Sequence, residues 1–219
     1  YPYYPACTIQ GTEADETLTG TYGNDVICTG GGNDIVNAGA GDDIVIAQNG
    51  GSVVLDLGTG NDIFDGTDGS DAVVNGGDGA DELIGTPGTD ELNGQEGYDS
   101  LLAGASNDRL NGGAGNDLID GGTGNDVAVF SGPRSDYTIS WSSSAGSFTV
   151  ISASEGTDTL LNIESLKFAN KTVVAADIVA AGGDKSPAIA KFWKDNTKTV
   201  RPQSIGRNQD PVLWFKQDD

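Results

Sequence analysis

GGAGNDLIDGGTGNDVAV, residues 112–129, decides the fold, because it contains two consecutive copies of one nine-residue pattern. Each copy has glycine at positions one, two and four, aspartate at position six and an aliphatic residue at position eight. Thirteen tandem units of this kind run from Gly11 to Val129, with single-residue insertions expected at Asp56 and Asn75. No helix or strand requires an aspartate at every ninth residue. The period therefore indicates a repeat architecture with a row of bound metal ions.

Each unit predicts a sharp turn followed by a very short strand. The glycines allow positive φ, so the chain can turn tightly and direct carbonyl groups inward. Positions seven to nine then alternate outward, inward and outward. Two consecutive units complete one flat coil, and stacked coils form a solenoid in which each unit packs on its neighbours. The expected inward residues are those at position eight: Leu18, Ile27, Val36, Val45, Val54, Phe64, Val73, Leu83, Leu92, Leu101, Leu110, Ile119 and Ala128.

The units resemble the calcium-binding nonapeptides of RTX (repeats-in-toxin) proteins, also called haemolysin-type repeats, over residues 11–129. The resemblance implies an all-β fold, a right-handed parallel β-roll, with Ca²⁺ held between successive turns on each edge. The implied carboxylate ligands are Asp25, Asp34, Asp43, Asp62, Asp71, Asp81, Asp90, Asp99, Asp108, Asp117 and Asp126, with Glu16 as a weak ligand. The implied carbonyl ligands belong to Gly20, Gly76, Gly79, Gly85, Gly94, Gly97, Gly112, Gly115, Gly121 and Gly124.

The register predicts eight calcium sites between aspartates and a ninth, weaker site that uses Glu16. Odd-numbered units share one edge of the roll and even-numbered units share the other. Unit five, AQNGGSVVL, has Ser52 where the acid belongs, so the two sites that use it should be empty or weak. Glu16 is one methylene longer than aspartate, and its unit lacks the fourth-position glycine. Nine Ca²⁺ would bring the formal net charge of −22 close to −4.

The ligand chemistry favours calcium over other ions. Carboxylates with backbone carbonyls suit a hard ion such as Ca²⁺, and the smaller Mg²⁺ tolerates such a cage poorly. The chain has no histidine and only two cysteines, which excludes a conventional zinc site. The alternative is that the acids only keep the surface soluble or the chain disordered. Solubility does not require aspartate at every ninth position, so we expect disorder without calcium and folding with it.

The two cysteines and the calcium requirement both indicate an oxidising, calcium-rich location outside the cytoplasm. A disulfide between Cys7 and Cys28 would fix the N-terminal lead-in, residues 1–10, across the first coil; two free thiols are the alternative. Extracellular calcium modules bind with dissociation constants of about 10⁻⁴–10⁻³ M, which cytosolic calcium barely loads. We expect a secreted, cell-surface or periplasmic protein. Because no methionine is present, the chain is expected to be a processed form or part of a longer protein.

Residues 130–181 predict a small β-rich cap. DYTISWSSSAGSFTVISA reads as two strands joined by a turn at residues 143–146. The DYT tripeptide and the stretch GTDTLLNIESLKF resemble the segment that follows the repeats in RTX proteins. An uncovered coil exposes apolar surface and strand edges, so a cap is required. The residues expected to cover the end are Phe130, Tyr137, Ile139, Trp141, Phe148, Val150, Leu160, Ile163, Leu166 and Phe168; a ligand site among these aromatic residues is the alternative.

Residues 182–219 form a linker and an aromatic, basic tail. The last 36 residues carry seven of the eleven basic residues and five acids, a balance of +2 against −24 for the rest of the chain. Two aromatic clusters, Phe192 with Trp193 and Trp214 with Phe215, are expected to be docking elements for a protein partner. The alternatives are that the tail folds back on the acidic roll, or that it is a secretion signal.

Three functions fit these features. The first is a non-catalytic extracellular calcium-binding β-roll that acts as a structural or partner-binding subunit, in scaffolding or adhesion. The second is the C-terminal export and folding module of a larger enzyme secreted by a type I system. The third is a metal-independent solenoid for adhesion or ice binding, but Thr17 and Thr19 are not repeated down the stack. A catalytic role is disfavoured by the absence of histidine and of the HExxH and GxSxG motifs.

The composition also argues against two classes of partner. The acidic chain would be repelled by nucleic acid, and no apolar run approaches the roughly 20 residues of a membrane span.

Overall fold

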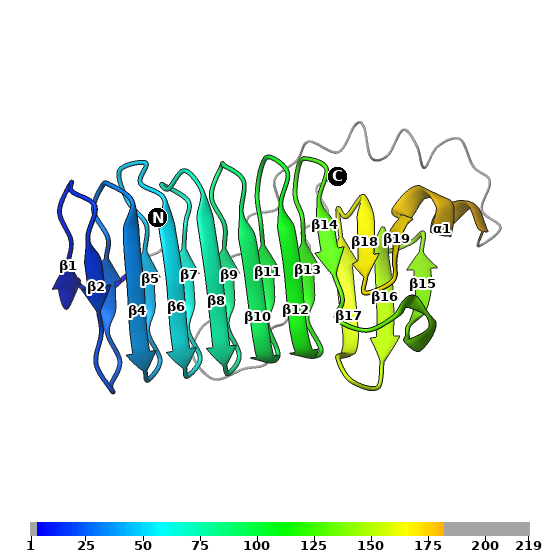
Figure 1. The fold of residues 1–219 in the computed structure, drawn as a ribbon, viewed down its shortest axis with the longest axis horizontal. Helices are drawn as coiled ribbons and strands as arrows, with labels where there is room; N and C mark the ends of the chain where they lie inside the picture. The colour runs from blue at the N-terminus through cyan, green and yellow to red at the C-terminus, as the bar shows by residue number, and fades with distance from the viewer. Residues whose placement is uncertain (1–3, 182–219) are drawn as a thin grey trace.

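A computed structural model describes residues 4–181. The fold is all-β, as expected: parallel strands form a solenoid of about seven turns, and a small antiparallel layer and one short helix close its C-terminal end (Figure 1). No helix in this described part of the chain has the length and apolar character that a membrane crossing requires.

The repeat units form two ladders of parallel strands, one from odd-numbered units and one from even-numbered units. The odd ladder contains β2 (Thr17–Thr19), β4 (Asp34–Ala40), β6 (Val53–Thr59), β8 (Ala72–Asp78), β10 (Glu91–Gly97), β12 (Arg109–Gly115) and β14 (Val127–Val129). The even ladder contains β1 (Ile9–Gln10), β3 (Val26–Cys28), β5 (Ile44–Ile46), β7 (Ile63–Asp65), β9 (Glu82–Ile84), β11 (Ser100–Leu102) and β13 (Leu118–Asp120).

The core is a thin apolar stripe between the two ladders. Leu83 pairs with Leu101, and Leu101 with Ile119, so identical unit positions stack on every second unit, as expected. Each of these side chains is at most 1% exposed. The buried apolar residues of one unit range from Leu101 alone in β11 to Val53, Leu55 and Leu57 in β6. That is too little apolar area for a unit to fold alone, so each turn depends on its neighbours.

The expected inward positions of Val54 and Val73 are wrong. Val54 is 52% exposed and Val73 is 41% exposed, whereas their neighbours Leu55 and Val74 are fully buried. The cause is where the extra residues lie. The turns of residues 47–52 and 66–71 each hold one residue more than the matching turn of residues 29–33, so the insertions precede β6 and β8 and are not at Asp56 and Asn75. A shift of one residue exchanges the two faces of a strand.

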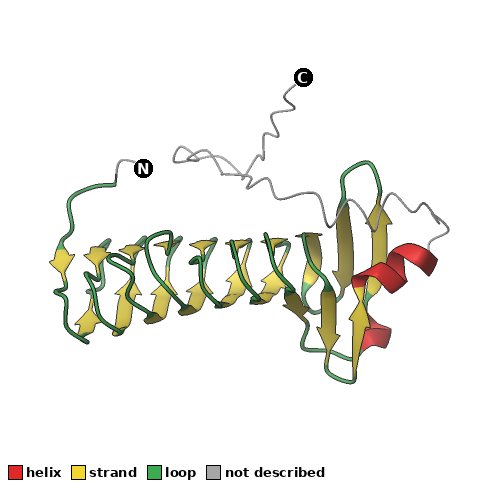
Figure 2. Ribbon diagram, turned by 90° about the horizontal axis from the view of Figure 1, so that it is seen from above, coloured by secondary structure: helices red, strands yellow, loops and turns green. Residues whose placement is uncertain are grey.

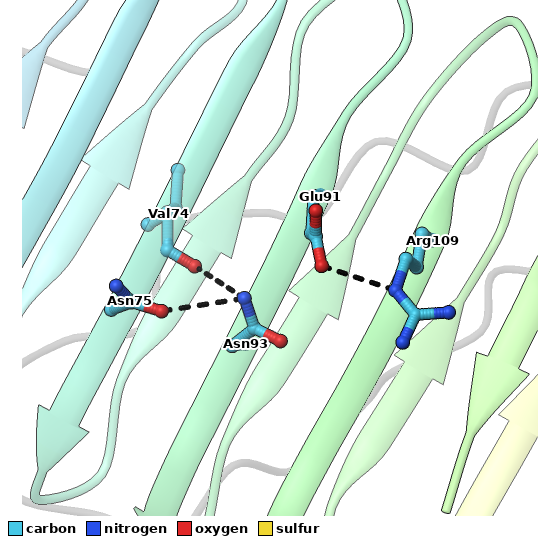
Figure 3. Close-up of polar contacts among 5 residues, drawn as sticks. All are labelled: Val74, Asn75, Glu91, Asn93 and Arg109. Carbon is cyan, nitrogen blue, oxygen red and sulfur yellow. Dashed lines mark hydrogen bonds and ion pairs between the residues drawn. The ribbon is translucent and has the colours of Figure 1, made fainter.

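Polar contacts on the outer face of the odd ladder follow this shifted register (Figure 3). The side-chain amide of Asn93 donates to the Oδ1 of Asn75 at 3.3 Å and to the carbonyl of Val74 at 3.4 Å. The Nε of Arg109 forms an ion pair with Glu91 at 3.1 Å. Neighbouring strands therefore match on their outer surface as well as in the core.

The first coil is held by a disulfide. Cys7 is bonded to Cys28, with the two Cα atoms 5.8 Å apart, which is the pairing that the sequence indicated. The lead-in continues the even ladder, because Ile9 pairs with Ile27 in parallel register. The hydroxyl of Thr8 donates to Asp25 at 3.2 Å. The cross-link thus attaches the segment that covers the open N-terminal end of the core.

The C-terminal layer contains the expected hairpin. β15 (Thr138–Ser142) and β16 (Ser147–Ser152) are antiparallel and are joined by residues 143–146. β17 (Gly156–Leu161) pairs with β16, and β18 (Ser165–Phe168) pairs with β19 (Lys171–Val174), which leads into α1 (Ala175–Ala181). Figure 2 shows this layer and the helix at one end of the solenoid. A 3₁₀ turn, Arg134–Asp136, precedes the hairpin.

Aromatic side chains close the end of the core. The rings of Phe130, Tyr137 and Phe168 lie within 5.0 to 5.2 Å of one another, centre to centre. Trp141 packs on Phe148 at 4.6 Å. Phe130, Tyr137, Phe148 and Phe168 are buried, so packing accounts for these residues as the sequence indicated.

The solenoid resumes after the hairpin. β17 is parallel to β13, with Leu160 opposite Ile119, and its first residue Gly156 is opposite Gly115 at the end of β12. β18 is parallel to β14, with Leu166 opposite Ala128. Residues 153–161, ASEGTDTLL, therefore occupy the register of a fourteenth unit, displaced along the sequence by the hairpin. The cap is an insertion between repeat turns together with the turn that follows it.

Candidate metal sites on the two edges of the roll

One acidic column runs along the edge formed by the turns of the even units. From Asp43 onward, each aspartate Oδ1 accepts a hydrogen bond from the backbone N–H of the aspartate one turn earlier. Asp43 accepts from Asp25 at 2.7 Å, and the same contact recurs at each turn as far as Asp117, which accepts from Asp99 at 2.9 Å. The structure therefore brings together all the predicted even-unit aspartates: Asp25, Asp43, Asp62, Asp81, Asp99 and Asp117.

The column on the odd edge is interrupted. Asp34 accepts from the N–H of Glu16 at 2.9 Å, and Asp108 accepts from Asp90 at 2.8 Å. The contact recurs between Asp126 and the N–H of Asp108, at 2.9 Å. Between Asp34 and Asp90, apolar Val53 and Ala72 stand at the positions of the acids. The odd edge thus has a short acidic block, an apolar gap and a second acidic block.

The structure does not place Asp71 in this column. Asp71 is exposed, and its Oδ1 accepts the N–H of Thr89 at 2.8 Å. Residues at position five of their units make this contact: Asn107, for example, accepts the N–H of Asn125 one turn later at 2.8 Å. The longer turn of residues 66–71 shifts Asp71 by one position and gives its expected place to Ala72.

The second carboxylate oxygen of most column aspartates has no partner within the protein. The side chains are at most 3% exposed, so solvent does not satisfy these oxygens either. An unsatisfied buried polar atom costs about 1–3 kcal/mol, and more when it is charged. Such a row indicates positions where a cation binds. The unpartnered atoms are the Oδ2 atoms of Asp34, Asp43, Asp62, Asp81, Asp99, Asp108, Asp117 and Asp126.

In the units of Asp81, Asp99, Asp117 and Asp126, glycine at position one leaves room beside the unpartnered oxygen. The units of Asp34, Asp43, Asp62 and Asp108 have Thr29, Ala38, Leu57 and Ala103 at that position. A Cβ on Gly94 would lie 2.2 Å from the Oδ2 of Asp99 and 2.5 Å from the carbonyl oxygen of Gly112. At Gly76, the corresponding distances to Asp81 and to the Gly94 carbonyl are 2.5 and 2.7 Å. A carboxylate oxygen and a carbonyl oxygen of the next turn thus converge where only glycine fits.

Glycine at position four allows the turns to stack. Gly97 has φ of 143°, and a Cβ on it would lie 1.5 Å from the carbonyl oxygen of Gly79. Gly115 meets the carbonyl of Gly97 in the same way. The carbonyls of successive turns therefore point along one edge, close to the acidic column, as the glycine pattern predicted.

In three acids, hydrogen-bond donors of the protein occupy a carboxylate oxygen that could otherwise bind an ion. The Oδ2 of Asp90 accepts the N–H of Thr86, and its Oδ1 accepts the Thr86 hydroxyl, both at 2.7 Å. The N–H of Thr21 donates to the Oδ2 of Asp25 at 2.7 Å, and the N–H of Thr12 donates to the Oε2 of Glu16 at 2.6 Å. Each of these units has threonine at position two.

Burial shifts the acidity of the aspartates that lack such bonds. It raises the pKa of Asp62, Asp99, Asp108 and Asp126 to about 7, with neighbouring column carboxylates adding to the shift. The pKa of Asp25 lies below its ordinary value, because hydrogen bonds from Thr21 and Thr8 outweigh burial. In these four aspartates, burial outweighs the backbone hydrogen bond that each accepts, so the protein alone stabilises the charged form poorly.

Two acids of the C-terminal layer extend the columns and were not identified as site residues from the sequence. Asp158 accepts the N–H of Asp117 at 3.1 Å, and Glu164 accepts the N–H of Asp126 at 2.8 Å. Burial raises the pKa of Asp158 to about 8. The available signal was the Gly-Thr-Asp tripeptide of residues 156–158, which repeats unit positions four to six outside the nine-residue period.

The arrangement fits a hard divalent cation. Among residues 4–181, no three acidic, histidine or cysteine side chains converge on one point. A bound ion would instead take carboxylates from adjacent turns and backbone carbonyls, which is oxygen-only coordination suited to Ca²⁺. The predicted docking residues Phe192, Trp193, Trp214 and Phe215 lie outside the described residues.

Comparison with known families agrees with this geometry. The family described as RTX calcium-binding nonapeptide repeat matches the chain in four copies, at residues 10–45, 49–73, 71–101 and 94–128, which together make up more than half of its length. No curated protein matches the chain. The matched region contains both acidic columns and ends before the C-terminal layer.

Proposed function

The chain belongs to the RTX calcium-binding nonapeptide-repeat family, and from this membership we propose a non-catalytic extracellular module whose folding is coupled to Ca²⁺. Its role is structural: a stiff scaffold or adhesion subunit that presents surfaces to a protein partner. The observation that carries the proposal is the row of eight buried, unpartnered carboxylate oxygens, four of them beside position-one glycines. The bound ion supplies positive charge there and thereby stabilises the packing of adjacent turns.

We assign seven sites to adjacent aspartate pairs within the repeats. Five lie on the even edge, from the Asp25 and Asp43 pair to the Asp99 and Asp117 pair. Two lie on the odd edge, between Asp90 and Asp108 and between Asp108 and Asp126. Glu16 with Asp34 forms a weaker site. Asp71 is not a ligand in this assignment, because it is exposed and accepts a hydrogen bond from the N–H of Thr89. The carbonyls of the position-one and position-four glycines complete the coordination.

The proposed location is outside the cell. RTX repeat proteins are typically secreted, and the Cys7–Cys28 disulfide is suited to an oxidising compartment. High extracellular calcium would load the sites after export. Before export, at low calcium, the chain would carry its formal net charge of −22 without compensating ions and stay unfolded.

The tail is the proposed docking element for the partner. Residues 184–219 carry a balance of +2 with two aromatic clusters, whereas the rest of the chain carries −24. Pull-down of a partner by the full chain, compared with a chain that ends at residue 184, tests this role. Equal recovery by both chains would refute it.

The second candidate function is a C-terminal export and folding module of a larger secreted enzyme. It is favoured by the same acidic columns, which keep the chain unfolded until it meets calcium. Fusing the chain to an unrelated reporter and measuring type I export separates the two candidates. Calcium-dependent export of the fused reporter would favour the export module. Equal export of the fused reporter and of the reporter alone would favour the scaffold.

Circular dichroism during calcium titration tests the proposed function. The chain is first depleted of calcium, and Mg²⁺ is titrated in parallel as a control. We expect a cooperative coil-to-β transition with Ca²⁺ and none with Mg²⁺. A β spectrum that is unchanged by chelation would refute coupled folding.

A further inference from the structure

The last turn of the solenoid is shared between the repeats and the C-terminal layer. The strand pairs β13 with β17 and β14 with β18 join segments that the hairpin separates in the sequence, whereas successive repeat turns follow one another directly. On the even edge, Gly156, Thr157 and Asp158 take the places of unit positions four, five and six. A Cβ on Gly156 would lie 1.8 Å from the carbonyl oxygen of Gly115, as at the position-four glycines before it.

The hydrogen bonds of the even column continue into this turn. The N–H of Asp117 donates to the Oδ1 of Asp158 at 3.1 Å, as each earlier aspartate does to the next. The N–H of Thr157 donates to the Oδ1 of Asn116 at 2.8 Å, which is the position-five contact. Asp158 is 3% exposed, and the buried Oδ2 of Asp117 beside it has no partner.

The odd edge ends in an equivalent way with a glutamate. The N–H of Asp126 donates to the Oε2 of Glu164 at 2.8 Å, and the N–H of Glu164 donates back to the carbonyl of Asp126 at 3.2 Å. A Cβ on Gly121 would lie 2.4 Å from the carbonyl oxygen of Asn162 and 2.8 Å from the Oδ2 of Asp126. That Oδ2 is buried and unpartnered, so it faces a carbonyl of the C-terminal layer as interior aspartates face the next repeat.

We infer that Asp158 and Glu164 are calcium ligands, which complete one terminal site on each edge with Asp117 and Asp126. This inference rests on the proposed calcium binding by the repeats and adds two ions to the seven assigned there. Each ion bridges the last repeat turn and the C-terminal layer. Calcium therefore links the C-terminal layer to the roll through β17 and the turn before β18.

The test removes one charge at a time while keeping the hydrogen-bond acceptor. Asp158→Asn retains an Oδ1 for the N–H of Asp117, and Glu164→Gln retains an Oε atom for the N–H of Asp126. Asp177→Asn, at an exposed position in α1, is the matched control. Native mass spectrometry of the full chain counts bound Ca²⁺. We expect each single variant to bind one ion fewer, the double variant two fewer and the control the same number as the unchanged chain.

Amide hydrogen exchange gives a second measurement that does not depend on the count. In the unchanged chain, calcium should slow exchange at Ser100 in β11, Thr159 in β17 and Ser165 in β18. In the double variant, protection at Ser100 should persist while protection at Thr159 and Ser165 is lost. An unchanged ion count with unchanged protection in the double variant would overturn the inference and leave the seven repeat sites intact. Failure of the unchanged chain to bind calcium would overturn both.

Discussion

The N–H of Asp81 donates to the Oδ1 of Asp99 at 3.0 Å, and the Oδ2 of Asp99 has no partner. The Oδ1 of Asp99 thus binds the backbone of the preceding turn, and its Oδ2 is available to bind a cation. The division recurs along both edges, so losing an interior aspartate affects the sites on either side of it.

Replacing Asp99 by alanine should remove two bound calcium ions, because Asp99 contributes to the pairs with Asp81 and with Asp117. Asp71→Ala is the control, since Asp71 is exposed and outside the column. Native mass spectrometry at saturating calcium should show a loss of two ions for the first variant and none for the second. Loss of an ion from Asp71→Ala would contradict the shifted register of β8.

Truncating Leu55 should destabilise the calcium-loaded protein far more than truncating Val54. Leu55 is 1% exposed and Val54 is 52% exposed. Leu55→Ala is expected to lower the free energy of unfolding by about 2–5 kcal/mol, and Val54→Ala by less than about 0.5 kcal/mol. Chemical denaturation at fixed calcium measures both. The reverse order would restore the register that the nine-residue period predicted.

Alanine at Gly97 should be severely destabilising. Its φ of 143° is unfavourable for a side chain, and the new Cβ would lie 1.5 Å from the carbonyl oxygen of Gly79. The expected cost exceeds about 2 kcal/mol. Gly23→Ala is the matched control, because nothing lies within 4 Å of a Cβ there. Thermal melts in excess calcium should separate the variants clearly; equal melting temperatures would contradict the stacking described for position four.

Without calcium, the chain should gain β-structure as the pH falls. Burial raises the pKa of Asp62, Asp99, Asp108 and Asp126 to about 7, above the value of about 3.9 for an unfolded aspartate. The folded state then binds protons more tightly than the unfolded state. Its added stability is complete below pH of about 4 and is lost as the pH rises through about 7.

Circular dichroism of the calcium-depleted chain between pH 4 and pH 8 measures this effect. We expect more β-structure at the acidic end. Saturating calcium should reverse the trend, because ion binding requires deprotonated carboxylates. A depleted chain that is more folded at pH 8 than at pH 4 would show that burial does not control these groups.

Much of the fold follows from the period alone. The period places Leu101 inward and Asp99 at the edge, and the Cys7–Cys28 pairing also agrees with the structure. The register of β6 does not follow, because Val53, Val54, Leu55 and Leu57 give apolar residues in either alternation. The register of β6 is set by the length of the turn before it, residues 47–52, and the extra residue of that turn has no distinctive sequence pattern. Asp158 was missed as a site residue because the hairpin separates it from the repeats that share its register.

The apolar gap at Val53 and Ala72 makes the two edges mechanically unequal. When calcium is withdrawn, the buried column carboxylates repel one another along the whole even edge, whereas on the odd edge such carboxylates stand only at its two ends. Repulsion that lengthens one side of an elastic rod bends the rod toward its other side. Partial unloading should therefore curve the roll before it unravels, with the inside of the bend at residues 47–72 and the even edge stretched.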